Sequence, residues 1–181
     1  FFAFRHGLKD TRSEPLTVMG PRDLDRVMAG LKQAFGSTLF DIRFPVEFRI
    51  IGPGDRFDLG PESVLSVAKT PHTDESLAMR IDSGDRSLCY TGDTGYTEEL
   101  AGFFNKTDVL ISECSFRARR EGVAHLSIED AATIAAQAKA ARLVVTHFYF
   151  DVNDDELKSK LQQSFGGEVL IGRDGMSIEL E

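Results

Sequence analysis

Four side chains capable of metal chemistry each follow a short apolar stretch that is typical of a buried strand. They belong to His72, Asp93, Glu113 and His147. In α/β arrangements the carboxyl ends of strands, and the loops after them, gather at one edge of the sheet. Imidazole groups bind zinc and related divalent ions, and a carboxylate can bridge two such ions. The spacing of these residues therefore predicts a metal-dependent hydrolytic site.

Each of these residues, taken alone, also has a plainer structural explanation. A histidine after a strand is commonly a surface or hydrogen-bonded residue. Asp93 stands in Gly-Asp-Thr-Gly, which is a typical turn sequence, and Glu113 could pair locally. His125 could simply precede a helix without a role, and His6 has no supporting context. Only the combination of these residues in order favours chemistry.

Two further groups of reactive side chains carry weaker signals. Cys89 lies within a predicted strand and Cys114 adjoins Glu113, and both are expected to be buried thiols without function. The arginines at positions 117, 119 and 120 predict a solvated loop, with a phosphate contact as the less favoured alternative.

Strands and helices must alternate to position these residues, and this alternation predicts an α/β fold. Ser127 with a carboxylate three residues later begins a helix in the manner of a capping box. A turn at Asp174-Gly175 predicts a closing hairpin. Helices are predicted over Arg22–Phe35 with one core-facing stripe, Glu98–Phe104, Ser127–Ala140 and Asp155–Phe165. Strands are predicted over Leu16–Met19, Val46–Ile51, Phe57–Leu59, Val64–Ala68, Ser76–Ile81, Leu88–Thr91, Val109–Ser112, Leu143–Thr146, Glu168–Gly172 and Met176–Leu180.

The composition excludes several classes of protein. Hydrophobic residues make up 41% and charged residues 28% of the 181 residues, as in soluble globular proteins. No apolar run approaches the ~20 residues that cross a membrane, so no membrane partner is expected. A net charge of −8 disfavours non-specific binding of nucleic acid, although a nucleotide or an RNA held through metals stays open. A small-molecule or nucleotide-like substrate is expected, and RNA is the less favoured partner. Two cysteines are too few for a disulfide framework and indicate a reducing, cytoplasmic compartment.

Five segments in a fixed order carry a resemblance to a known family. The ordered series resembles the metallo-β-lactamase superfamily and, within it, the ribonuclease Z-like branch. The resemblance covers nearly the whole chain, because Glu14–Pro21 also resembles the segment that follows the first metal motif of that family. The five segments are Thr70–Thr73, Leu88–Thr94, Asp108–Phe116, His125–Ser127 and Val144–His147.

The resemblance implies a fold, a chemistry and a set of roles. The fold would be the αββα sandwich, with residues 1–181 as part of a single domain. His72 and His147 would each bind one of two divalent metal ions, and Asp93 would bridge them. The metals would be zinc, with manganese or iron as alternatives. A metal-activated hydroxide would cleave a phosphodiester or another ester, while His125, oriented by Glu113, protonates the leaving group. A homodimer is an open alternative, since related proteins often dimerise.

The sequence departs from the family in three places. The His-x-His-x-Asp-His run is absent, so we expect the chain to be the larger C-terminal part, lacking the N-terminal strands and the first metal motif. Arg80–Leu88 predicts a tight hairpin where tRNA-processing relatives often carry a long insertion, and Ser112 replaces a histidine. The alternatives left open are a non-catalytic binding or scaffold protein and a tRNA 3′-processing endonuclease.

Overall fold

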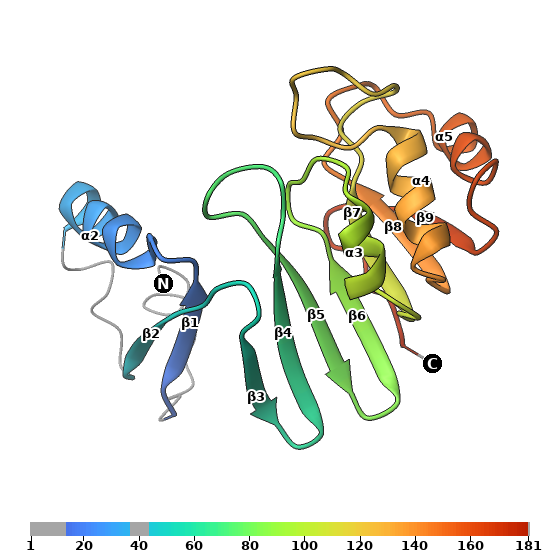
Figure 1. Ribbon diagram of the computed structural model, residues 1–181. Helices are drawn as coiled ribbons and strands as arrows, with labels where there is room; N and C mark the ends of the chain where they lie inside the picture. The colour runs from blue at the N-terminus through green and yellow to red at the C-terminus, as the bar shows by residue number, and fades with distance from the viewer. Residues whose placement is uncertain (1–13, 37–43, 181) are drawn as a thin grey trace. The chain divides into compact units, whose positions relative to one another are not determined.

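The computed structural model describes residues 14–36 and 44–180, and their contacts divide the chain into two compact units. In the first unit, which covers positions 1–52, strand β1 (Leu16–Gly20) pairs in parallel with β2 (Val46–Ile50). Helix α2 (Leu24–Phe35) lies between them in the sequence (Figure 1). The N-terminal segment Phe1–Leu8, which includes His6, lies outside the described residues.

Helix α2 forms where the apolar spacing predicts it, but its predicted core-facing stripe is not buried. None of its residues is buried, and Val27 and Phe35 are 50% and 65% exposed. The described part of this unit gives the helix only a two-stranded sheet to contact. The predicted stripe is therefore half-buried at Leu24, Met28 and Leu31 and exposed at Val27 and Phe35.

The second unit, positions 53–181, is built on a seven-stranded sheet in the order β3-β4-β5-β6-β7-β8-β9. Strands β3 to β6 are antiparallel neighbours, whereas β6 to β9 are parallel. Strands β4, β6, β7 and β8 consequently run in one direction and end at one edge of the sheet. The bounds are β3 Arg56–Gly60, β4 Ser63–Lys69, β5 Leu77–Ser83, β6 Arg86–Tyr90, β7 Val109–Glu113, β8 Arg142–Thr146 and β9 Glu168–Ile171.

Three helices lie along one face of the parallel part of this sheet (Figure 1). They are α3 (Glu98–Phe103), α4 (Ile128–Gln137) and α5 (Asp154–Leu161). As predicted, Thr97 caps α3, and Ser127 and Asp130 form a reciprocal capping box at α4. No helix in the described part of the chain is both long enough and apolar enough to cross a membrane.

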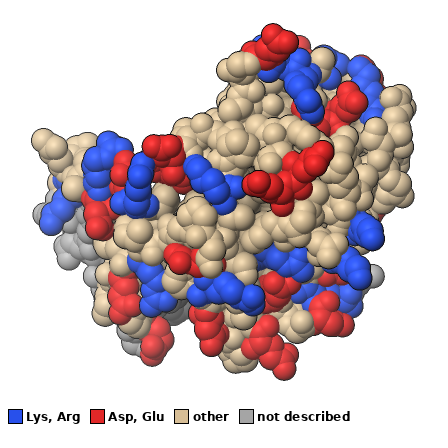
Figure 2. Space-filling model, in the orientation of Figure 1, with Lys and Arg blue, Asp and Glu red and all other residues tan. Residues whose placement is uncertain are grey.

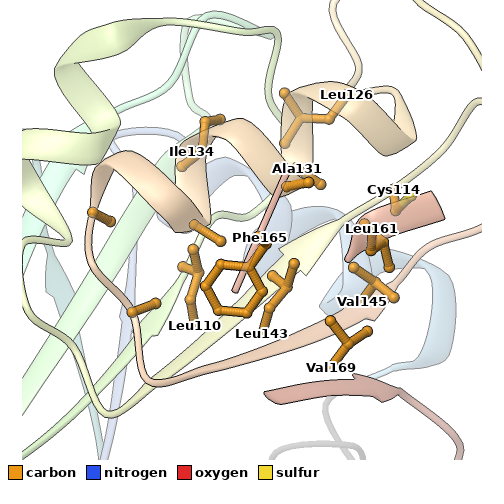
Figure 3. Close-up of a cluster of buried hydrophobic side chains, with 14 of the residues drawn as sticks. Leu110, Cys114, Leu126, Ala131, Ile134, Leu143, Val145, Leu161, Phe165 and Val169 are labelled. Atoms are coloured by element: carbon orange, nitrogen blue, oxygen red, sulfur yellow. The ribbon is translucent and has the colours of Figure 1, made fainter. Parts of the chain in front are cut away.

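The core of the second unit lies between these helices and the parallel strands (Figure 3). Leu110 and Leu143 point from β7 and β8 toward Ala131 and Ile134 of α4, and Phe165 fills the space beside them. All four aliphatic side chains are fully shielded from solvent. The alanines of α4 let the helix approach the sheet closely. This layer fixes the strands that carry the candidate site.

The predicted closing hairpin is wrong. The chain turns at Asp174-Gly175 as expected, but residues 176–180 form no strand. Met176 and Leu180 remain 41% and 40% exposed, and β9 pairs with β8 alone in the described sheet. An alternating apolar pattern needs a partner strand and a surface to cover, and this segment has neither among the described residues.

Candidate metal centre

The residues predicted from strand ends converge at one edge of the sheet. One ligand atom from each of His72, Asp93 and His125 lies within 4.8 Å of the others. His147 Nε2 lies 3.5 Å from Asp93 Oδ2. Three imidazoles and one carboxylate therefore share a single small region, delivered by the chain after β4, β6, β7 and β8.

The loops that carry His72 and Asp93 are tied to each other by two hydrogen bonds. The hydroxyl of the fully buried Thr70 donates to the Asp93 carbonyl over 3.0 Å. The backbone N–H of Gly95 donates to the carbonyl of Pro71 over 2.9 Å. Because each bond joins the loop of one candidate ligand to the loop of the other, the backbones that carry His72 and Asp93 are held together.

Asp93 is positioned by a glycine immediately before it. Gly92 has φ of 60°, and a Cβ atom there would lie 2.7 Å from the backbone oxygen of Leu77. An L-residue would meet both the left-handed conformation and this backbone contact. The glycine of the Gly-Asp-Thr-Gly turn is thus required for the close approach of the Asp93 loop to β5.

His147 is held in an unfavourable backbone conformation at the end of β8. Its φ is 60°, a left-handed value that costs a non-glycine residue about 1–2 kcal/mol. Its Nε2 atom is buried and has no hydrogen-bond partner among the described residues. An unsatisfied buried nitrogen costs stability unless something pairs with it. A cation beside Asp93 would satisfy this atom.

The donor set fits a divalent metal ion. His72 Nδ1 lies 3.2 Å from the Ser76 hydroxyl, which fixes the orientation of the ring. The rings of His72 and His147 approach the ring of His125 with centroid separations of 4.8 and 5.5 Å. Histidine nitrogens with a carboxylate oxygen are ligands typical of zinc. His72, Asp93 and His147 would hold the metal, and His125 stands close enough to be a ligand or to act beside it.

Glu113 organises the surroundings of His125 from inside the core. Its carboxylate is 1% exposed and accepts hydrogen bonds from the Thr94 N–H (2.6 Å), the Ser115 hydroxyl (2.7 Å) and the Leu126 N–H (3.0 Å). Its Oε1 also lies 2.9 Å from His125 Nδ1. A carboxylate surrounded by donors acts as acceptor, so Nδ1 carries the hydrogen and Nε2 is left for other partners.

Sequence reasoning missed two residues of this neighbourhood. Ser115 donates to Glu113 and also lies 3.4 Å from His125 Nδ1. Tyr149 places its ring 5.5 Å from that of His125 and 5.0 Å from that of His147, yet it is 59% exposed. The position of Tyr149 two residues after His147 was the available signal. An exposed aromatic ring beside candidate ligands can contact a substrate.

The thiol of Cys114 and the phenol of Tyr90 also lie near this edge, and neither is ionised to a nucleophile at neutral pH. Burial, followed by the charges of Glu113 and Asp130, raises the pKa of the Cys114 thiol to about 12. Burial also raises the pKa of Tyr90, with smaller contributions from Asp93 and Glu113. Both groups therefore stay protonated, and the prediction that Cys114 is a buried thiol is confirmed.

Comparison with known proteins gives the same family as the motif series. The model of the β-lactamase superfamily domain matches residues 4–148. "Probable metallo-hydrolase YhfI" of Bacillus subtilis is 35% identical over 130 residues, which are 70% of this chain and 52% of that protein. "Ribonuclease Z" of Haloarcula marismortui is 33% identical over 102 residues, or 53% of this chain and 33% of that protein.

Solved structures confirm the predicted α/β fold. The crystal structure of the metallo-β-lactamase fold protein YhfI gives a TM-score of 0.72 at 30% identity, covering 90% of this chain and 64% of that one. Human tRNase Z, short form, gives 0.71 at 18% identity, with 93% and 68% covered. The chain thus spans about half, or less, of the length of the two curated relatives.

Proposed function

Because the chain belongs to the β-lactamase superfamily, we propose that it forms the divalent-metal centre of a hydrolase acting on small phosphodiesters or related esters. The observation that carries the proposal is the buried Nε2 of His147, which makes no hydrogen bond among the described residues and lies beside Asp93, with His72 in the same region. A divalent cation held there supplies Lewis acidity, which activates water and polarises a phosphoryl or carbonyl oxygen.

His125 is proposed to give a proton to the leaving group, and Glu113 is proposed to orient its imidazole. The Glu113 carboxylate accepts from Nδ1 and stabilises the charge of a protonated imidazole. Such an imidazolium can give a proton from Nε2 to the oxygen of the leaving group. The other three donors to Glu113 keep its oxygens fixed, so His125 is oriented before a substrate binds.

A small substrate is favoured over a tRNA by three features of the chain. Strands β5 and β6 are joined by a tight turn at Gly84, so this hairpin carries no arm. On the face shown in Figure 2, basic and acidic side chains are interspersed rather than gathered into a continuous basic surface. The net charge of −8 further opposes the binding of a polyanion.

Hydrolysis of bis(4-nitrophenyl) phosphate by the zinc- or manganese-loaded protein tests the proposal. His147→Ala should lower both the bound metal and the rate. His125→Ala should retain the metal and lower the rate by about 10²-fold or more, as loss of a proton donor does. Glu168→Gln, an exposed position on β9, is the control and should change neither.

Three results would redirect the proposal. Saturable metal binding without hydrolysis of any ester would favour the non-catalytic binding protein. Efficient cleavage of precursor tRNA would favour the tRNA 3′-processing endonuclease. Loss of metal in His125→Ala would make His125 a ligand rather than a proton donor.

A further inference from the structure

A cavity of about 400 Å³ opens beside His125. Its wall includes His125 itself, so a molecule seated in the cavity reaches the proposed proton donor. The volume suits a group of nucleotide size, since small-molecule sites generally occupy about 300–1,000 Å³. The rest of the wall includes Pro71, Tyr96, Arg119, Arg120 and Asp130.

Arg119 forms part of the cavity wall, but its positive charge is compensated by a carboxylate. Its guanidinium forms an ion pair with Asp130, whose side chain is 2% exposed. Asp130 is itself fixed by the Ser127 capping box at the start of α4. The guanidinium also lies over the ring of Tyr96, 4.8 Å from its centroid. Arg119 is therefore neutralised and pinned to the wall.

Arg117 is committed in a different direction. Its guanidinium pairs with Glu156 of α5 over 3.2 Å and donates to the carbonyl of Asp151 over 2.8 Å. It also lies 4.8 Å from the centroid of the Phe150 ring. Arg117 thus holds the loop to α5 and is absent from the cavity wall.

Arg120 is the arginine of the cavity wall whose charge no described carboxylate compensates. Its guanidinium lies 4.1 Å from the centroid of the Phe116 ring, and among the described residues no carboxylate forms an ion pair with it. The Phe116 ring in turn lies 6.1 Å from the ring of His125. One aromatic ring thus separates an uncompensated cation from the proposed proton donor.

We propose that Arg120 binds a second anionic group of the substrate, a phosphate apart from the ester that is cleaved. This inference rests on the proposed function and narrows its substrate class to small phosphodiesters that carry an additional phosphate. A planar guanidinium donates two parallel hydrogen bonds to phosphate oxygens, and stacking on Phe116 pre-orients it. Arg119 stays with Asp130 and shapes the wall on which the ligand rests.

Equilibrium binding tests this assignment without requiring turnover. The probes are thymidine 3′,5′-bisphosphate and thymidine 5′-monophosphate, which differ by one phosphate, measured by isothermal titration calorimetry on the zinc-loaded protein. The wild type should bind the bisphosphate about tenfold more tightly, as one charge-assisted contact provides. Arg120→Ala should bring the ratio of the two dissociation constants close to one, and Arg120→Lys should give an intermediate ratio.

Arg86→Ala is the matched control, because Arg86 lies at the opposite end of β6 and outside the cavity wall. Its ratio should equal that of the wild type. A preference for the bisphosphate that survives in Arg120→Ala, an equal loss in Arg86→Ala, or binding of neither probe would overturn the assignment. Arg120-dependent preference in a protein that hydrolyses no ester would leave the subsite standing and contradict the proposed function alone.

Discussion

Replacing Glu113 by glutamine should destabilise the protein far more than an isosteric change usually does. The two carboxylate oxygens accept from four donors, and the glutamine amide retains one oxygen and adds a donor of its own. If the new NH₂ replaces Oε2, it faces the N–H of Leu126; if it replaces Oε1, it faces the N–H of Thr94. Either way one buried backbone N–H loses its acceptor and faces the hydrogens of the new amide.

The cost follows from the burial of this carboxylate. An unsatisfied buried polar group costs about 1–3 kcal/mol, so the loss of this acceptor should lower the free energy of unfolding by about 1–3 kcal/mol. Urea unfolding followed by circular dichroism measures this, with Glu168→Gln as the exposed control. A Glu113→Gln protein that unfolds at the same urea concentration as Glu168→Gln would refute the argument that Glu113 is held as an acceptor.

Three other changes should have separable effects. Gly92→Ala should lower the free energy of unfolding by more than about 1 kcal/mol and weaken zinc binding, because of its left-handed φ and the contact with Leu77; thermal unfolding and zinc titration measure both effects. Burial opposes ionisation of Asp130, but hydrogen bonds from Arg119 and Ser127 outweigh it and hold its pKa below the ordinary 3.8. The advantage of the wild type over Asp130→Asn in urea unfolding should therefore be constant well above pH 3.8 and shrink as the pH falls through and below that value, whereas an advantage as large at pH 2 as at pH 6 would contradict it. The Cys114 thiol, with its pKa near 12, should react with a thiol reagent at pH 8 only after unfolding, and rapid labelling of the folded protein would show that the thiol is accessible.

Apart from the strand expected at residues 176–180, the sequence predicted the elements of the second unit because their signals are local. Ser127 and Asp130 define the start of α4 by their own hydrogen bonds, and Ser83-Gly84-Asp85 closes the β5–β6 hairpin. The meeting of His72, Asp93 and His147 also followed from strand ends, since the sheet runs these strands in one direction.

What the sequence did not predict depends on contacts between distant segments. The burial of α2 requires a surface for its stripe, and the pairing of residues 176–180 requires a neighbouring strand; neither can be read from apolar spacing. Ser115 and Tyr149 come together beside the site only because β7 pairs with β8, which is not visible in the sequence. Likewise, Arg117, Arg119 and Arg120 look alike in the sequence, yet each has a different partner in the structure.

X-ray absorption at the zinc edge tests the central claim most directly, because it detects which side chains surround a bound ion. The metal-free protein titrated with zinc should show scattering from at least two imidazoles, with Zn–N distances of about 2.0–2.1 Å. His147→Ala should lose one imidazole contribution or fail to bind zinc. A spectrum without imidazole scattering, or one that His147→Ala leaves unchanged, would contradict a metal centre built from His72, Asp93 and His147.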